Sequence, residues 1–468
     1  MDQSKKAIGF FVSLAFLVLG FLIITTKQIE PSSDFALIEW QVKLVGKGIF
    51  HLPYDYSLQD PKFQLVPFPE VFFHTKDNFI YSTFPNFYPI LVFPFYMSLG
   101  TMGIKLIQLL LFFLSAFVFY QIKKDTVATI LLLFGSTISV YIFLVHDTIL
   151  FLFLEVVILF LYHRKWTIVS GFLSLCLVWM RPEMLFTALI LPICFSKEIN
   201  WKQYFLTFFA TGFVFSIINQ IIFGTFIPLR IFKAPQYHFR IDSSFYLFKI
   251  WLEQVPIFIL SVIYCIRFFF HKKILYQNIF LILITLFMIL ISPNTGGHNT
   301  PRYLFGLFPL YILLLRKNEE NETTISKKWF FICLLLSLYS LTVLFQQTKE
   351  IKKISKFQSN TLEELSKIED KILVFNNADF AFVVLPLLDQ KKDILLLRNS
   401  DSTETFFQIL NAKNTKSFTF LELPPSPFPI GEIITQPRCL KDCSFQKGET
   451  KPVPNTLLPI MATQYKRM

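Results

Sequence analysis

The stretch Ser32-Ser33-Asp34-Phe35-Ala36-Leu37-Ile38-Glu39-Trp40 separates two kinds of sequence. It follows a hydrophobic run, residues 7–24, and lies near the start of a more polar segment, residues 27–101. From residue 102 to residue 346 hydrophobic runs of helical length dominate the chain. We therefore expect this stretch to lie at the edge of a membrane, in an outer loop between a first spanning helix and a helical bundle.

Two helices are predicted within this outer loop. Ser32 or Ser33 can cap a helix that runs to about Val45. The apolar residues on one side of it are Ala36, Leu37, Trp40, Leu44 and Val45. Such a stripe is typical of a helix that lies along the membrane surface. The segment 84–99 is also apolar but contains three prolines, which predicts a second surface-lying helix or a re-entrant segment.

Composition indicates a polytopic α-helical membrane protein. Of the 468 residues, 53% are hydrophobic and 59 are Phe, and the mean hydropathy is +0.53. These values exclude an ordinary soluble globular protein, and segments that cross lipid must be helices to satisfy their own backbone. The formal net charge of +12 is explained by Lys and Arg in cytoplasmic loops. No basic-aromatic module is visible, so we expect no nucleic-acid partner.

The hydrophobic runs predict about eleven transmembrane helices. The first is 7–24, and the others are 102–122, 126–145, 148–162, 166–180, 184–196, 203–223, 250–269, 275–292, 302–315 and 328–346. The stretch 166–196 is either one long helix or two short ones, because Arg181-Pro182 lies at its middle. Two helices joined by an aqueous turn at Arg181 keep the charge out of mid-membrane and the proline out of a helix.

The distribution of basic residues sets the expected orientation. With eleven spans, most clusters of Lys and Arg fall in cytoplasmic loops, and only the long loop 224–249 breaks the pattern. The first run is preceded by Lys5 and Lys6 and has no small-residue cleavage site after it. We therefore expect an uncleaved first helix, a cytoplasmic N-terminus and an extracytoplasmic C-terminus.

The composition changes after residue 346, which divides the chain into a membrane domain, 1–346, and a soluble domain, 347–468. Short apolar runs at 372–375, 394–397 and 418–421 alternate with helix-like stretches at 379–388 and 403–410. This alternation predicts a small extracytoplasmic α/β domain with a parallel sheet. The Pro-rich tail from about residue 424 is expected to be irregular.

Ionisable residues are concentrated at the ends of the predicted spans. Those expected to share the outer membrane face are Asp34, His146, Asp147, Arg181, Glu183, His298, Arg302 and Tyr303, with Lys233 and Arg240 in the loop 224–249. Ionisable groups at membrane depth are functional candidates, although each one alone is also explained as a helix-end or snorkelling charge. Their shared face favours a common site.

These residue types suit the transfer of a sugar from a lipid phosphate. A carboxylate can accept the proton of an acceptor hydroxyl, which is the role expected of Asp34. Arginine stabilises the charge that a leaving phosphate gains, which we expect of Arg302 and Arg181, with Lys233 and Arg240 as weaker candidates. The remaining members of the set, Asp147, His146, His298, Glu183 and Tyr303, are expected to position substrate. A divalent metal is left open, because no ligand spacing supports one.

The order of the motifs resembles the GT-C membrane glycosyltransferases, in particular the protein mannosyltransferase, aminoarabinose transferase and RgtABCD-like group. An Asp-led amphipathic helix ends near glycine at 34–48 and is followed by Tyr81-Ser82-Thr83-Phe84-Pro85-Asn86-Phe87-Tyr88-Pro89-Ile90-Leu91. Asp147 follows the third span, a Gly-containing span ends in a charged turn at 171–183, and a Gly-Gly motif with Pro-Arg-Tyr-Leu lies at 296–304. An extracytoplasmic α/β tail is also common in that group.

The resemblance implies a polyprenyl-phosphate-linked sugar donor, an acceptor at the outer face, Asp34 as general base and a place in the bacterial inner membrane. The acceptor is a glycan, a lipid or a protein, and membrane lipid is a further partner. The sequence departs from the group at Phe35, where a second acid is frequent, and at Phe84-Pro85-Asn86-Phe87, where the group has a His-Pro-Pro-Gly-like motif. The alternatives are a transporter or flippase of a lipid-linked glycan and a catalytically inactive scaffold homologue.

Overall fold

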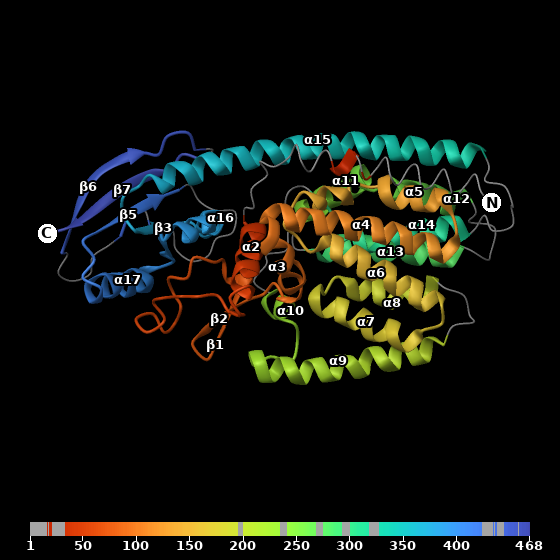
Figure 1. Cartoon of the computed structure of the whole chain (residues 1–468), viewed down its shortest axis with the longest axis horizontal. Helices are drawn as coiled ribbons and strands as arrows, with labels where there is room; N and C mark the ends of the chain where they lie inside the picture. The colour runs from red at the N-terminus through yellow and green to blue at the C-terminus, as the bar shows by residue number, and fades with distance from the viewer. Residues whose placement is uncertain are drawn as a thin grey trace. The chain divides into compact units, whose positions relative to one another are not determined.

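A computed structural model describes residues 16, 18–20, 33–194, 200–234, 241–267, 275–292, 300–317, 327–423, 434, 436–437, 444–456 and 458–468 (Figure 1). The predicted first span, 7–24, lies mostly outside these residues. The chain forms two compact units, and each is described by itself. The helical unit comprises 1–27 and 99–351, and the α/β unit comprises 28–98 and 352–468.

The helical unit is a bundle of mostly short apolar helices. Its helices are α4 Thr101–Lys123, α5 Thr126–Phe134, α6 Thr148–His163, α7 Thr167–Met180, α8 Met184–Cys194, α9 Trp201–Phe223, α10 Leu229–Lys233, α11 Ile241–Gln254, α12 Ile257–Arg267, α13 Leu275–Ile291, α14 Phe308–Lys317 and the first part of α15 Lys327–Ser366, with 3-10 turns η2 Ile138–Ile142 and η4 Phe305–Leu307. Helix α6 packs between α4 and α7, and α7 packs on α9 (Figure 1). Gly171 allows that last contact, because a Cβ there would meet the carbonyl oxygen of Tyr204 at 2.5 Å.

Several helices in the described residues are suited to a membrane. Three are long and apolar enough to cross one, namely Thr101–Ile122, Trp201–Phe223 and Phe331–Ser366, and the bent pair Ile241–Gln254 with Ile257–Ile266 would make a fourth. Six further apolar helices have only 10–17 residues. The polytopic helical class predicted from composition is confirmed, whereas the number of eleven spans stays a prediction.

Three of the predicted spans differ from the helices that form. The predicted span 126–145 is wrong, because α5 ends at Phe134 and Gly135 caps it before the 3-10 turn η2. The predicted span 250–269 is also wrong, because α11 and α12 meet at 95° around Pro256, which cannot continue a helix. Helix α15 continues to Ser366, well past the predicted end at residue 346.

The interruption predicted within 166–196 is confirmed. Helix α7 ends at Met180, Arg181 is extended (φ −137°, ψ 98°), and α8 begins at Met184. The expectation that Arg181 sits at an aqueous turn is wrong, because its side chain is only 2% exposed. Other protein groups, described below, surround it.

The α/β unit begins with the helix predicted after Ser33. Helix α2, Asp34–Val45, has Ser33 at its N-cap, but the Ser33 side chain makes no capping hydrogen bond, so that detail of the prediction is wrong. After the 3-10 turn η1 Glu70–Phe72, strands β1 Phe73–Lys76 and β2 Phe79–Ser82 form an antiparallel hairpin. The predicted helix in the segment 84–99 is present as α3, Phe87–Leu99.

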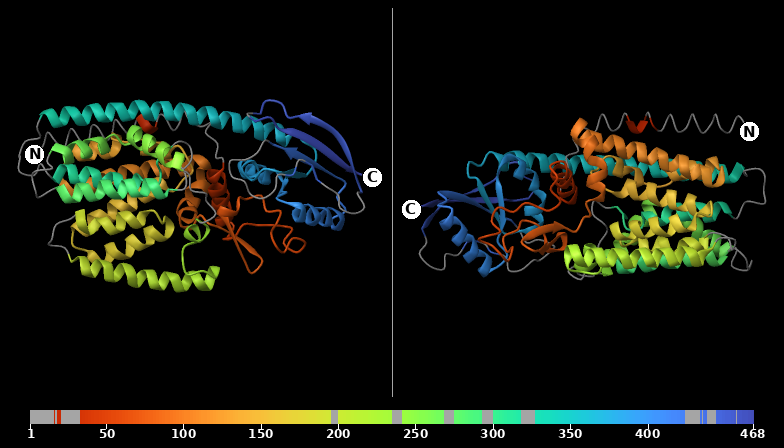
Figure 2. Two further views of the ribbon diagram at one scale, coloured as in Figure 1. Left: turned by 180° about the vertical axis from the view of Figure 1, so that it is seen from behind. Right: turned by 60° about the horizontal axis from the view of Figure 1, so that its bottom comes forward.

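A five-stranded sheet in the order β4-β3-β5-β7-β6 forms the centre of this unit (Figures 1 and 2). Strands β3 Ile372–Phe375, β4 Asp393–Leu396 and β5 Ser417–Glu422 are parallel, as predicted, and alternate with α16 Ala378–Val383, the 3-10 turn η5 Leu385–Gln390 and α17 Ser400–Ala412. Strands β7 Met461–Arg467 and β6 Phe445–Pro452 continue the sheet in antiparallel fashion. The predicted irregular tail is therefore wrong for these two segments, whose polar composition conceals their pairing.

Both faces of the parallel part of the sheet are covered. The end of α15, through Leu362 and Leu365, packs with α16 on one face. Helix α17 packs on the other face together with Tyr56 and Leu65 from the loop that precedes the hairpin. From its sequence this loop was predicted to belong to the membrane domain, whereas in the structure it packs on the sheet.

Arg398 holds part of the same loop. Its Nη2 donates hydrogen bonds to the carbonyl oxygens of Val66 (2.6 Å) and Phe68 (2.8 Å). Its guanidinium lies 5.8 Å from the ring centroid of Phe73. Burial lowers the pKa of this arginine to about 10, because the charged form loses the stabilisation that water provides.

Candidate functional site

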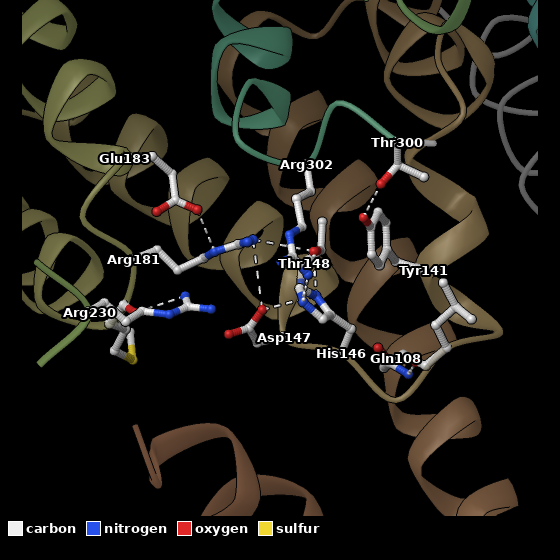
Figure 3. Close-up of polar contacts among 12 residues, drawn as sticks. Gln108, Tyr141, His146, Asp147, Thr148, Arg181, Glu183, Arg230, Thr300 and Arg302 are labelled. Atoms are coloured by element: carbon white, nitrogen blue, oxygen red, sulfur yellow. Dashed lines mark hydrogen bonds and ion pairs between the residues drawn. The ribbon is translucent and has the colours of Figure 1, made fainter. Parts of the chain in front are cut away.

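A polar cluster lies at the start of α6, where His146, Asp147 and Thr148 are all buried (Figure 3). His146 Nδ1 lies 2.7 Å from Thr148 Oγ1 and 3.1 Å from Asp147 Oδ1. His146 Nε2 lies 3.1 Å from Arg302 Nη1. Because arginine can only donate, Nε2 accepts the hydrogen bond from Arg302. Nδ1 is also approached by the Thr148 backbone N–H at 3.3 Å.

Two buried arginines from distant parts of the chain converge on this segment (Figure 3). Arg181, in the turn between α7 and α8, donates from Nη1 to Thr148 Oγ1 at 3.3 Å, and the same nitrogen lies 3.7 Å from Asp147 Oδ1. Its Nε lies 2.8 Å from Glu183 Oε1. Arg302, which precedes η4, donates to His146 as described above. Both arginines are less than 10% exposed.

Arg230 on α10 is a third arginine of the cluster, and it was not among the predicted site residues. Its Nη1 donates to the carbonyl oxygen of Met180 at 3.5 Å, and its charge acts on both Asp147 and Glu183. The signal in the sequence was the loop 224–249, whose basic residues oppose the positive-inside rule.

Tyr141 and Gln108 extend the cluster on the side of α4 (Figure 3). The Tyr141 hydroxyl is hydrogen-bonded to Thr300, and its ring centroid lies 5.1 Å from that of His146. Gln108 Nε2 donates to the carbonyl oxygen of Leu144 at 2.7 Å. These contacts fix the chain just before α6. Sequence reasoning missed both residues, because a Tyr or Gln within an apolar run carries no distinctive pattern.

Glu155, two turns along α6 from Thr148, is a further missed residue. It is 1% exposed, and neither carboxyl oxygen has a hydrogen-bond partner among the described residues. It lines a small cavity of about 10 Å³ together with Thr148, Arg181 and Arg302. A volume of that order accommodates about one water molecule. The signal was present as the lone acid in the apolar run 148–162.

The structure brings together most of the predicted site residues of the helical unit. His146, Asp147, Arg181, Glu183 and Arg302 form the cluster. The ring of Tyr303 lies 5.4 Å from the Arg302 guanidinium carbon, and Lys233 ends the same short helix that carries Arg230. Asp34 begins α2 in the α/β unit and is 7% exposed. His298 and Arg240 lie outside the described residues.

The balance of charge in the cluster favours an anion. Three guanidinium groups, those of Arg181, Arg230 and Arg302, face the two carboxylates of Asp147 and Glu183. Arg181 Nη2 is buried and has no hydrogen-bond partner in the part of the chain that the structure describes. A buried donor without a partner is costly, and an oxyanion would satisfy it. Within the same residues no three His, Cys, Asp or Glu side chains are grouped so as to hold a metal ion.

Comparison with known proteins identifies the fold. No family model matches the sequence, and no curated protein matches it. Among solved structures, the chain is similar to the crystal structure of ArnT from Cupriavidus metallidurans bound to undecaprenyl phosphate. The match covers 97% of this chain and 98% of that chain, with a TM-score of 0.54 and 9% sequence identity. The predicted GT-C-type fold with a C-terminal α/β domain is thereby confirmed.

Proposed function

We propose that the chain is an integral membrane glycosyltransferase of the GT-C type in the bacterial inner membrane. It transfers a sugar from a polyprenyl-phosphate-linked donor to a glycan, lipid or protein acceptor at the outer face. Two findings support this function: the fold is shared with ArnT, whose structure contains undecaprenyl phosphate, and the helical unit contains a buried cluster with an excess of guanidinium groups. The convergence of Arg181 and Arg302 on one segment is the observation that carries the proposal.

In this proposal the arginine cluster binds the donor phosphate. When the bond to the sugar breaks, the phosphate gains negative charge, and donors already fixed in position stabilise that charge without reorganising. Arg181 is fixed in this way by Glu183 on one side and by Thr148 on the other. His146 accepts a hydrogen bond from Arg302, and Asp147 lies 3.7 Å from Arg181, so the role of these two residues is to position the arginines.

Asp34 is proposed as the general base that accepts the proton of the acceptor hydroxyl. Its support comes from the sequence resemblance and from its place as the first residue of a buried amphipathic helix. Gln41 on the same helix donates from Nε2 to the carbonyl oxygen of Phe84 and to Asn86 Oδ1, both at 3.0 Å. Lys43 forms an ion pair with Asp389 of the turn η5. These contacts hold α2 within the α/β unit.

Binding of undecaprenyl phosphate to the purified protein tests the phosphate site without knowledge of the sugar. We expect native mass spectrometry to show a bound lipid phosphate on the wild type and weaker binding to the variant Arg302→Gln. Arg164→Gln is the matched control, because Arg164 caps the opposite end of α6 and is exposed. Equal binding by wild type and Arg302→Gln would contradict the assignment of the phosphate site.

A further inference from the structure

A second hollow, which we call the lysine groove, lies within the α/β unit. It is formed by β5, β7 and β6 beside Ile368 and encloses about 570 Å³. That volume is within the range of small-molecule sites, roughly 300–1,000 Å³. Ile368 and Ala462 are its apolar lining residues, and the others are polar or charged apart from Gly448. The groove therefore favours a hydrophilic ligand over a lipid chain.

The groove is positively charged. It is lined by Lys447, Lys451 and Lys466 and by one acid, Glu449. Glu449 Oε2 lies 2.9 Å from Lys451 Nζ, and Lys447 Nζ donates to Gln436 Oε1 at 3.4 Å. Lys466 has no ion-pair partner among the described residues. Positive charge left over after the internal pair favours an anionic group such as phosphate.

A buried carboxylate orders the polar wall of the groove. Asp370 Oδ2 accepts hydrogen bonds from Thr419 Oγ1 at 2.7 Å and from Gln464 Nε2 at 3.1 Å. Ser417 Oγ donates to the other oxygen of Asp370. The bond to Gln464 uses its amide nitrogen and leaves its amide oxygen for another partner. Fixed amides and hydroxyls are the groups that recognise the hydroxyls of a sugar.

A β-bulge lies at the middle of the groove. The register between β6 and β7 shifts between Lys447 and Thr450, so Gly448 and Glu449 both oppose Gln464. A Cβ at Gly448 would meet the carbonyl oxygen of Gln464 at 2.9 Å, which is why glycine stands there. Bulges occur at sheet edges and beside binding sites, where they redirect side chains.

Protection of the sheet edge against aggregation explains only part of this arrangement. Lysines and a bulge on an edge strand discourage pairing with another chain, and β6 is an edge strand. However, Lys466 and Gln464 belong to β7, which lies between β5 and β6 and has no free edge. Their position in the groove is better explained by a ligand.

We propose that the lysine groove binds a saccharide that carries phosphate. The lysines bind the phosphate, and Gln446, Gln464 and Thr419 bind the sugar hydroxyls. This binding does not require the transferase activity, and only the further step, that such a saccharide is part of the acceptor, rests on the proposed function.

Titration of the full-length protein in detergent with glucose 6-phosphate, glucose and inorganic phosphate tests this site. We expect glucose 6-phosphate to bind at least about tenfold more tightly than either of the other two probes, because it uses both sets of contacts. The double variant Lys451→Ala/Lys466→Ala should weaken it by about tenfold or more. Gln446→Ala should weaken the binding of glucose 6-phosphate and leave that of inorganic phosphate unchanged. Lys416→Ala is the control, because Lys416 is exposed and outside the groove.

Each contrary outcome overturns the proposal in a defined way. Equal affinity for inorganic phosphate and glucose 6-phosphate, with no effect of Gln446→Ala, would leave a simple anion site. If Lys416→Ala weakens the binding of glucose 6-phosphate as much as the double variant does, the binding is only non-specific attraction to positive charge. If phosphatidylglycerol vesicles displace glucose 6-phosphate from the protein and glucose 6-sulfate does not, the ligand is a lipid headgroup. Because these readouts involve no sugar transfer, the groove can fail while the transferase stands, and the reverse also holds.

Discussion

Arg181→Gln is expected to weaken binding of undecaprenyl phosphate and also to destabilise the protein. The substitution removes one of three guanidinium groups, and with it the buried Nη2 donor that has no hydrogen-bond partner among the described residues and that we assign to the phosphate. A hydrogen bond to a charged group contributes about 1.5–3 kcal/mol, which corresponds to about 10- to 150-fold in Kd. The substitution also leaves Glu183 without its 2.8 Å partner. A buried charge that loses its partner costs about 3–5 kcal/mol, and we expect the low end because the Glu183 side chain is 15% exposed.

A second substitution separates the two effects. In Arg181→Gln/Glu183→Gln both charges of the pair are removed, so no uncompensated carboxylate remains. We expect thermal unfolding in detergent to return close to the wild-type midpoint, while the Kd for undecaprenyl phosphate stays raised. Arg164→Gln again serves as the control. If the double variant restores lipid-phosphate binding as well as stability, Arg181 acts only as the partner of Glu183 and the reasoning is refuted.

Three further predictions follow from the geometry. Gly171→Ala should lower the midpoint of thermal unfolding, because its Cβ would meet the Tyr204 carbonyl oxygen at 2.5 Å. The control Gly212→Ala, at the same helix pair, should be neutral, because its Cβ would have its nearest atom at 3.5 Å. Equal midpoints of the two variants would contradict the packing described. Asp34→Asn should abolish sugar transfer while lipid-phosphate binding stays at the wild-type level, and full activity in this variant would exclude Asp34 as the base. Arg398→Met should destabilise the α/β unit by about 1–3 kcal/mol, because two backbone carbonyls lose a donor. Limited proteolysis should then cleave the loop before the hairpin faster than in the wild type. An unchanged cleavage rate would show that other contacts hold this loop.

The helices and the parallel strands could be predicted because their signals are local. An apolar run of four residues between helix-like stretches marks β3, and Asp34 at the start of an amphipathic pattern marks α2. Strand β6 could not be found in this way, because seven of its eight residues are exposed and no apolar pattern marks them. Only its pairing with β7 shows that it is a strand. The break after Phe134 was missed because apolar residues dominate on both sides of it, although Gly135-Ser136-Thr137 marks it in the sequence and Gly135 ends the helix.

The candidate site was predicted in composition but not in its contacts. The residues of the turn 181–183 and of the start of α6 were expected on the outer membrane face. Their direct contacts could not be predicted, because the two segments are distant in the sequence. Arg230 and Glu155 each had a local signal, the basic loop 224–249 and the lone acid in the run 148–162, but only their neighbours in the fold show that they belong to the site. The packing of Tyr56 and Leu65 on the sheet is another non-local fact. Deleting residues 347–468 would therefore also remove the sheet on which the loop between α2 and the hairpin packs.

Sugar transfer by the purified protein, on lipids extracted from a strain that lacks it, tests the proposed transferase activity most directly. That extract should contain both the unused polyprenyl-phosphate-linked donor and the unmodified acceptor, so the sugar need not be known in advance. We predict that mass spectrometry will show the donor consumed, a polyprenyl phosphate released and one sugar added to an acceptor. The variant Arg181→Gln/Glu183→Gln should be defective in this transfer. An extract that remains unchanged with the wild-type protein, while the same protein moves a lipid-linked glycan across reconstituted vesicles, would contradict the transferase and identify a transporter.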